Sequence, residues 1–218
     1  LDRTAEELKK ETGNNDILGI AADVTDEAQV QKMVDTVVGT WGGLDILVNN
    51  AGTATSNPLS KITHAEWQHI MDVNATGTFL CSQAVYEKMA SRRWGRIVNV
   101  ASIAGLEGDK YISAYTAAKH AVVGFTKAMA IESKGKGITV NAVCPGYVDT
   151  PLTDETISRI MHHTGRSWEE ALMSLLGQSG QPRLIRAHEV ADEIVSLCLE
   201  ESGGRNGELV ILDASETP

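Results

Sequence analysis

Short apolar runs alternate with longer segments of helical periodicity along most of the chain. The apolar runs, which predict strands, cover residues 17–22, 44–48, 96–101, 138–143 and 208–212. The segments that predict helices cover residues 1–12, 26–41, 63–93, 114–132, 153–177 (as one or two helices) and 188–200. Strands separated by such helices imply crossover connections and a parallel sheet. We therefore expect an α/β protein, with Asp26 and Thr63 as N-caps of their helices.

The 218 residues contain no internal repeat, low-complexity tract or Pro/Gly/Ser-rich linker, so one domain over residues 1–218 is expected. The formal net charge is −10, which is the wrong sign for a protein that binds nucleic acid or an anionic membrane. No apolar run approaches the roughly 20 residues that span a bilayer. Three scattered cysteines and a polar, helical first segment favour a reducing compartment, and the cytoplasm is the expected location.

Small or polar residues follow four of the predicted strands. They form the segments Asp23-Val24, Asn49–Gly52, Ala101-Ser102 and Pro145–Thr150. Any one of them could be an ordinary turn, because Gly and Asn are common turn residues. Ligands of parallel α/β sheets bind at the carboxyl ends of the strands, so the four together favour a site there.

A tyrosine and a lysine share one face of the predicted helix 114–132, because Tyr115 and Lys119 are four residues apart. An ammonium group close to a phenol lowers the pKa of the phenol, which would let Tyr115 exchange a proton near neutral pH. Ser102 ends the preceding strand, and its hydroxyl could hydrogen-bond a carbonyl or alcohol oxygen. These groups suit the interconversion of a ketone and an alcohol, and no side chain carries hydride, so a nicotinamide cofactor is implied.

The sequence resembles the short-chain dehydrogenase/reductase family over nearly all of its length. The resemblance rests on Asp23-Val24-Thr25, Asn49–Gly52, Asn74, Ser102, Tyr115-x3-Lys119, Pro145-Gly146 and Thr150, in the family's order and spacing. It implies a doubly wound, Rossmann-type parallel sheet, an NAD or NADP cofactor, a small alcohol or ketone substrate, and a homo-oligomer, either a dimer or a tetramer. NAD is slightly favoured over NADP.

The resemblance also implies roles for individual residues. Tyr115 would be the catalytic acid and base, Ser102 the partner of the substrate oxygen, Lys119 the ligand of the nicotinamide ribose, and Asn74 the holder of a water in the proton relay. The cofactor would contact Asp23, Val24, Asn50, Ala51, Gly52, Tyr115, Lys119, Val148 and Thr150.

The chain departs from the family pattern at both ends. Residues 1–218 contain no T-G-x3-G-x-G turn after a strand, so we expect the first strand-helix-strand unit of the family, about 35–45 residues, to precede Leu1. Without it, apolar sheet edges would be exposed and the chain would be poorly stable or would associate. Asp213-Ala214-Ser215 stands where the family usually has Asp-Gly-Gly.

Residues 147–187 are expected to form a lid over the substrate, because insertions on a fixed scaffold set specificity. Their sequence resembles members that act on 3-hydroxyacyl or 3-hydroxy acid substrates. Arg166, Arg183 and Arg186 could neutralise an anionic group of such a substrate or could simply be exposed. His162 and His163 have no third ligand at metal spacing, so no metal site is expected. A non-catalytic binding module that kept the fold without a complete cofactor site is the alternative function.

Overall fold

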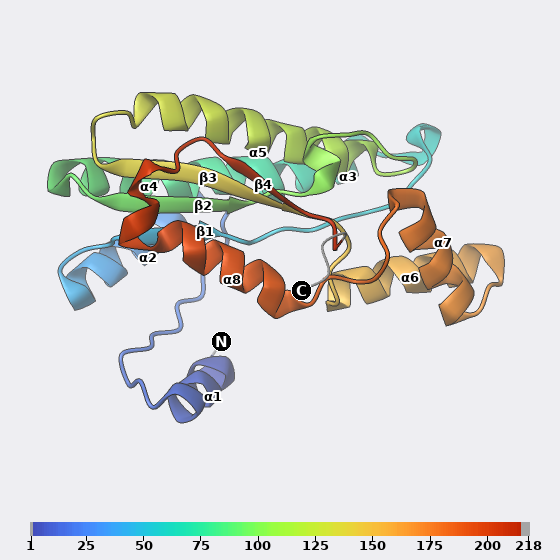
Figure 1. Cartoon of the computed structure of the whole chain (residues 1–218), viewed down its shortest axis with the longest axis horizontal. Coiled ribbons are helices and arrows are strands. Elements are labelled where there is room, and N and C mark those ends of the chain that lie inside the picture. The colour runs from blue at the N-terminus through green and yellow to red at the C-terminus, as the bar shows by residue number, and fades with distance from the viewer. Residues whose placement is uncertain (1, 215–218) are drawn as a thin grey trace.

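Four parallel strands form the sheet of this protein in a computed structural model that describes residues 2–214. Leu1 and Ser215, named above at the two ends of the chain, lie outside the described residues. The strands lie side by side in chain order (Figure 1). They are β1 (Ile46–Asn49), β2 (Gly95–Val100), β3 (Ile138–Pro145) and β4 (Leu209–Leu212). Every residue of β3 is buried, as expected for a central parallel strand that is covered on both faces. The predicted parallel α/β sheet is therefore confirmed.

Helices cover both faces of the sheet (Figure 1). One face carries α2 (Glu27–Trp41), α4 (Gly77–Arg92) and α5 (Ser113–Glu132), and the other carries α8 (Ala187–Cys198). Alternate residues of the strands point to opposite faces, so each face has its own apolar core. Ile97 and Val140 pack under α4 and α5, whereas Val98 and Val143 pack under α8.

The predicted helix 63–93 is interrupted near its middle. It consists of α3 (His64–Met71), a π-helical turn at Asp72–Thr76, and α4. The predicted N-caps are confirmed: Thr63 accepts a hydrogen bond from the backbone N–H of Glu66, and Asp26 caps α2 in the same way.

The predicted helical segment 153–177 is two helices, α6 (Pro151–Thr164) and α7 (Trp168–Ser179). Gly165 ends α6 in the left-handed region, with φ of 70°, and Ser167 begins α7 with a capping box. Short 3-10 turns at Leu59–Lys61, Ile103–Gly105 and Glu200–Gly204 connect other elements.

The first segment of the chain lies apart from the sheet (Figure 1). α1 (Asp2–Thr12) is helical as expected, but the strand predicted at residues 17–22 is wrong, because that segment has no regular structure. A strand exists only when a neighbour completes its hydrogen bonds, and none of the described strands pairs with residues 17–22. The outer edge of β1 is likewise unpaired within residues 2–214, and Ile46 and Val48 are 45% and 39% exposed, which matches the expected exposure of an apolar edge.

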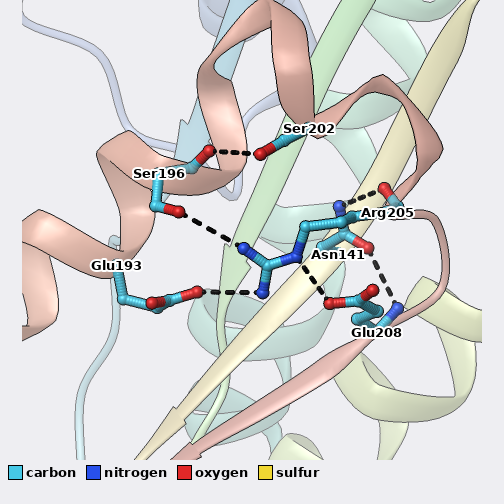
Figure 2. A network of polar contacts seen from close by, with 6 residues as sticks. All are labelled: Asn141, Glu193, Ser196, Ser202, Arg205 and Glu208. Atoms are coloured by element: carbon cyan, nitrogen blue, oxygen red, sulfur yellow. Dashed lines mark hydrogen bonds and ion pairs between the residues drawn. The ribbon is translucent and has the colours of Figure 1, made fainter.

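A polar network fastens β4 to α8 and β3 (Figure 2). The guanidinium of Arg205 contacts Glu193 at 3.0 Å, Glu208 at 2.8 Å and the hydroxyl of Ser196 at 3.3 Å. Asn141 of β3 donates to the carbonyl of Arg205 and accepts from the backbone N–H of Glu208, both at 2.9 Å. These bonds fix the turn between α8 and β4 at the end of the sheet away from the predicted site. Among the described residues, no helix is long and apolar enough to cross a membrane.

Candidate active site

A cavity of about 550 Å³ lies at the carboxyl ends of β1, β2 and β3. Its walls are the segments that follow these strands, together with parts of α5 and α6. Eight of the residues predicted for the site line this cavity: Asn50, Gly52, Asn74, Ser102, Tyr115, Lys119, Val148 and Thr150. A second hollow of about 980 Å³ lies around the amino ends of β2 and β3, and none of the predicted residues lines it.

Ser102 stands where β2 gives way to a 3-10 turn. Its hydroxyl accepts a hydrogen bond from the backbone N–H of Ala104 at 3.1 Å, which caps the turn Ile103–Gly105. The same hydroxyl donates to the carbonyl of Pro145 at 3.4 Å. The side chain is thus held between the ends of β2 and β3 and faces the cavity.

Tyr115 and Lys119 lie one turn apart on α5, and both line the cavity. The ammonium of Lys119 donates to the carbonyl of Val100 at 2.7 Å, which ties α5 to the end of β2. Small residues let α5 approach its neighbours closely, because Ala114 and Ala118 pack against Ile70 of α3.

Gly105 makes the close approach of the 3-10 turn to α5 possible. A Cβ atom at this position would lie 2.8 Å from the carbonyl oxygen of Lys119, which is a backbone atom and cannot move aside cheaply. The turn that carries Ser102 therefore packs against the helix that carries Tyr115 and Lys119. This packing sets the spacing of the three side chains.

Burial dominates the electrostatics of the pair on α5. It lowers the pKa of Lys119 to about 8, because the ammonium has left water. Burial also raises the pKa of the Tyr115 phenol, and a hydrogen bond with Ser102 only partly opposes that rise. The expected lowering of the Tyr115 pKa by Lys119 is therefore wrong for this arrangement: the ammonium lies 5.6 Å from the centre of the ring and is engaged with a carbonyl.

Asn74 is buried on the π-helical turn. Its Nδ2 atom donates to the carbonyls of Thr53 and Ile70, each at 2.9 Å, and its Oδ1 atom accepts from the backbone N–H of Thr53 at 3.3 Å. These bonds join the loop after β1 to the helix behind it. A π turn inside an α-helix frequently marks a functional site, and here it brings Asn74 to the cavity wall.

Three residues predicted to bind the cofactor do not line the cavity: Asp23, Val24 and Ala51. Asp23 is exposed, and its carboxylate accepts hydrogen bonds from the backbone N–H and the hydroxyl of Thr25, which lower its pKa. Val24 lies against Gly77 at the start of α4. The roles given to these three residues stay predictions.

The three arginines that could have met an anionic substrate or could simply be exposed do not line the cavity either. Arg183 forms a bidentate ion pair with Glu189, with distances of 2.7 and 2.8 Å. Arg166 donates to the hydroxyl of Ser174 at 2.9 Å. Arg186 is exposed at the start of α8. A different arginine, Arg159 of α6, does line the cavity.

Sequence reasoning also missed a residue that positions the loop after β3. The buried side chain of Gln181 accepts from the backbone N–H of Tyr147 and donates to its carbonyl, both at 2.8 Å, and it donates to the carbonyl of Arg183 at 2.6 Å. A Cβ atom on Gly146 would overlap the Gln181 amide, so a larger residue there would displace the Gln181 side chain from its hydrogen bonds with Tyr147. No local sequence pattern indicated this role of Gln181, because it lies 34 residues from Tyr147 along the chain.

The residues at the inner end of the cavity fit the nicotinamide end of an NAD(P) cofactor. One of the three N–H donors of Lys119 is bonded to the carbonyl of Val100, and the other two can bind ribose hydroxyls. A Cβ atom on Gly52 would lie 2.9 Å from Asn74 Oδ1 and 3.7 Å from Lys119 Nζ, so the glycine keeps this part of the cavity open. Val148 and Thr150 line the same cavity from the loop after β3. Within residues 2–214, no cluster of three or more His, Cys, Asp or Glu side chains could hold a metal ion.

Comparisons with known proteins show which family the chain belongs to. The family model of the short chain dehydrogenases matches residues 1–160. The chain is 34% identical to the D-beta-hydroxybutyrate dehydrogenase of Rhizobium meliloti, over 92% of the chain and 78% of that protein. It is 36% identical to the 3-oxoacyl-[acyl-carrier-protein] reductase of Vibrio cholerae, over 87% of the chain and 73% of that protein. The solved structure of levodione reductase superposes with a TM-score of 0.90 at 29% identity, over 98% of the chain and 82% of that structure.

The matched family model covers well over half of the chain, and the two relatives exceed 30% identity over most of their own length. Both relatives are oxidoreductases, and this finding disfavours the alternative of a non-catalytic binding module. The chain belongs to the short-chain dehydrogenase/reductase family, as an NAD(P)-dependent oxidoreductase that interconverts an alcohol and a ketone.

Proposed function

We propose that the protein interconverts a 3-oxo and a 3-hydroxy compound, either a free acid or an acyl thioester. One observation carries the proposal: Ser102, Tyr115 and Lys119 line the same cavity at the carboxyl ends of the strands. The substrate class is supported by the printed names of two relatives, a hydroxybutyrate dehydrogenase and a 3-oxoacyl reductase. Residues 147–187 serve as the lid, and α6 within this segment already forms part of the cavity wall.

Each catalytic residue acts on the substrate oxygen or on its neighbours. The hydroxyl of Ser102 hydrogen-bonds the ketone oxygen. Tyr115, which burial keeps protonated at neutral pH, donates the proton to that oxygen in the reductive direction and takes it back in the oxidative direction. Lys119 holds the ribose beside Tyr115, and Asn74 orders the wall behind them and holds the relay water. The nicotinamide, when bound, supplies or accepts the hydride.

Cofactor binding is assigned to Asn50, Ala51 and Gly52 after β1, to Val148 and Thr150 after β3, and to Asp23 and Val24 before α2. NAD is the preferred cofactor in this proposal. We further propose a cytoplasmic homo-oligomer: all three cysteines are free thiols, as in a reducing compartment, and α5 leaves Ile131 largely exposed.

The first experiment titrates the protein with NADH and NADPH and follows nicotinamide fluorescence. The second adds acetoacetate, methyl acetoacetate or S-acetoacetyl-pantetheine and follows the loss of nicotinamide absorbance. We expect micromolar binding of one reduced cofactor and turnover of at least one 3-oxo compound. Binding without turnover of any of these compounds would overturn the proposed substrate class, and a folded protein that binds neither cofactor would overturn the assigned cofactor site.

A further inference from the structure

A cation without a carboxylate partner lines the candidate active site. Arg159 lies on α6 and forms part of the cavity wall together with Leu152 and Thr156, which are seven and three residues earlier and so share its face of the helix. Arg3, Arg92, Arg183 and Arg205 all pair with carboxylates, but no carboxylate of the described residues lies within 4.0 Å of the Arg159 guanidinium.

The hydrogen bonds of Arg159 are few and long. One Nη atom donates to the carbonyl of Ala54 at 3.4 Å, and the other donates to the hydroxyl of Thr156 at 3.2 Å. The Nε–H group is buried and has no acceptor among the described residues. A guanidinium has five N–H donors, so at least three of them are unused.

A buried N–H group without an acceptor, such as the Nε–H of Arg159, costs stability, and a ligand in the cavity can supply the acceptor. The best acceptor for a planar guanidinium is a carboxylate or phosphate group, which takes two parallel N–H bonds at once. The cavity also has two carboxylates, Glu107 and Asp109, but both are exposed and lie on the loop that leads into α5. Lys119, the remaining cation of the wall, is already bound to Val100.

We infer that Arg159 binds an anionic oxygen group of the substrate, either a carboxylate or a phosphate, and so selects acidic substrates over neutral ones. The inference rests on the proposed function, since it assigns a binding group for the substrate of that same cavity. The loop 53–56 and α6 hold Arg159 from two sides, so the anion is bound between the segment after β1 and the lid. Arg166, Arg183 and Arg186, the arginines suggested by the sequence, take no part.

The test compares matched substrates in the wild-type protein and in Arg159→Met. Acetoacetate and methyl acetoacetate differ by the carboxylate charge, and S-acetoacetyl-phosphopantetheine and S-acetoacetyl-pantetheine differ by one phosphate. For each pair, the ratio of kcat/KM for the anionic substrate to kcat/KM for the neutral one is measured. We expect one ratio to fall by about 10- to 100-fold in Arg159→Met, because a charge-assisted hydrogen bond contributes about 1.5–3 kcal/mol. The pair that responds identifies the source of the anion.

Two further variants separate recognition from folding. Arg159→Lys keeps the charge without the bidentate geometry, and we expect it to restore part of the lost preference. Arg166→Met removes an exposed arginine of the same region that does not line the cavity, and it should leave both ratios unchanged. Arg159→Met protein that turns over neutral substrates normally and keeps both wild-type ratios would overturn the inference. Failure of the wild-type protein to reduce any of the four compounds would instead overturn the proposed function.

Discussion

The Nζ atom of Lys119 lies 5.6 Å from the centre of the Tyr115 ring, although the two residues are adjacent on one face of α5. The ammonium of Lys119 donates a hydrogen bond to the carbonyl of Val100 at 2.7 Å. The hydroxyl of Tyr115 is instead hydrogen-bonded with that of Ser102. The two groups therefore have separate tasks. Lys119 joins the helix to the end of β2, while Tyr115 and Ser102 are hydrogen-bonded to each other in the cavity wall.

Replacement of Tyr115 by phenylalanine removes the proposed proton donor and its hydrogen bond with Ser102. We expect kcat/KM for a 3-oxo substrate to fall by about 10²- to 10⁴-fold, the usual contribution of general acid catalysis. The midpoint of thermal unfolding and the affinity for reduced cofactor should stay near the wild-type values. Absorbance at the nicotinamide band in single-turnover experiments measures the chemical step. An unchanged single-turnover rate would remove Tyr115 from the mechanism.

The stability of the protein should rise with pH near pH 8 to 10 because of Lys119. Its pKa is about 8 in the folded protein and 10.5 when unperturbed, so between these values the unfolded chain binds more protons than the folded one. Stability then increases with pH, by about 3 kcal/mol in total at most. Below pH 8 both states are protonated, and the full cost of the buried charge is present.

Urea unfolding of the wild-type protein and of Lys119→Met at intervals from pH 7 to pH 10.5 measures this effect. The variant should lose the increase that the wild-type protein shows. Lys127→Met removes an exposed lysine two turns further along α5 and should keep it. Parallel curves for the wild type and Lys119→Met would show that Lys119 does not change its protonation on folding.

Replacement by alanine should change the stability of the protein differently at Gly105 and at Gly108. A Cβ atom at position 105 meets the backbone carbonyl of Lys119 at 2.8 Å, whereas at position 108 it meets no atom within 4 Å. We expect Gly105→Ala to destabilise the protein by about 1–3 kcal/mol, as other overpacked contacts do. Gly108→Ala should be neutral or stabilising by up to about 1 kcal/mol. Chemical unfolding measures the free energy of unfolding of both variants. Equal values for the two would contradict the close packing of Gly105 against α5.

The exposed end of α5 should form part of a subunit interface. Ile131 is 75% exposed, and Phe125 of the same helix stacks edge-on against the exposed Phe79 of α4 at 6.0 Å between ring centres. Replacement of Ile131 by aspartate places a charge at this exposed end of α5, so we expect Ile131→Asp to sediment as a smaller species than the wild type in sedimentation velocity experiments. Met173 of α7 is equally exposed but lies away from α4 and α5, so Met173→Asp is the matched control and should sediment like the wild type. A wild-type protein that sediments as a monomer would contradict the proposed interface.

The parts of the site that follow strands could be predicted from the sequence, because a parallel sheet gathers the residues after its strands at one edge. Asn50, Ser102 and Val148 come together for this reason. That Tyr115 and Lys119 share one face of a helix followed from their spacing, whereas their proposed roles came from the resemblance of the whole motif set to the family. The strand predicted at residues 17–22 was wrong because a short apolar run describes a single strand, whereas a strand also needs a neighbour to pair with, which the run does not contain.

The sequence gives little access to residues whose importance depends on contacts from a distant part of the chain. Arg159 looks like any charged residue of an amphipathic helix, and only the packing of α6 against the loop after β1 places it in the cavity wall. The direction of the Tyr115 pKa shift was predicted from the neighbouring charge, but the loss of hydration on burial raises this pKa, and a hydrogen bond with Ser102 only partly opposes the rise. Burial of a particular side chain is a property of the whole fold.

The π-helical turn at Asp72–Thr76 makes the number of residues in that stretch as important as their identity. A π turn closes its hydrogen bond over one more residue than an α-helical turn does, so it takes up one extra residue between α3 and α4 without changing their relative rotation. Deleting one residue there would allow α3 and α4 to merge into a single regular α-helix. α4 would keep its orientation relative to α3, but the widened turn that brings Asn74 to the cavity wall would be lost. A protein shortened in this way would keep its fold and would lose the backbone geometry of one residue of its candidate active site.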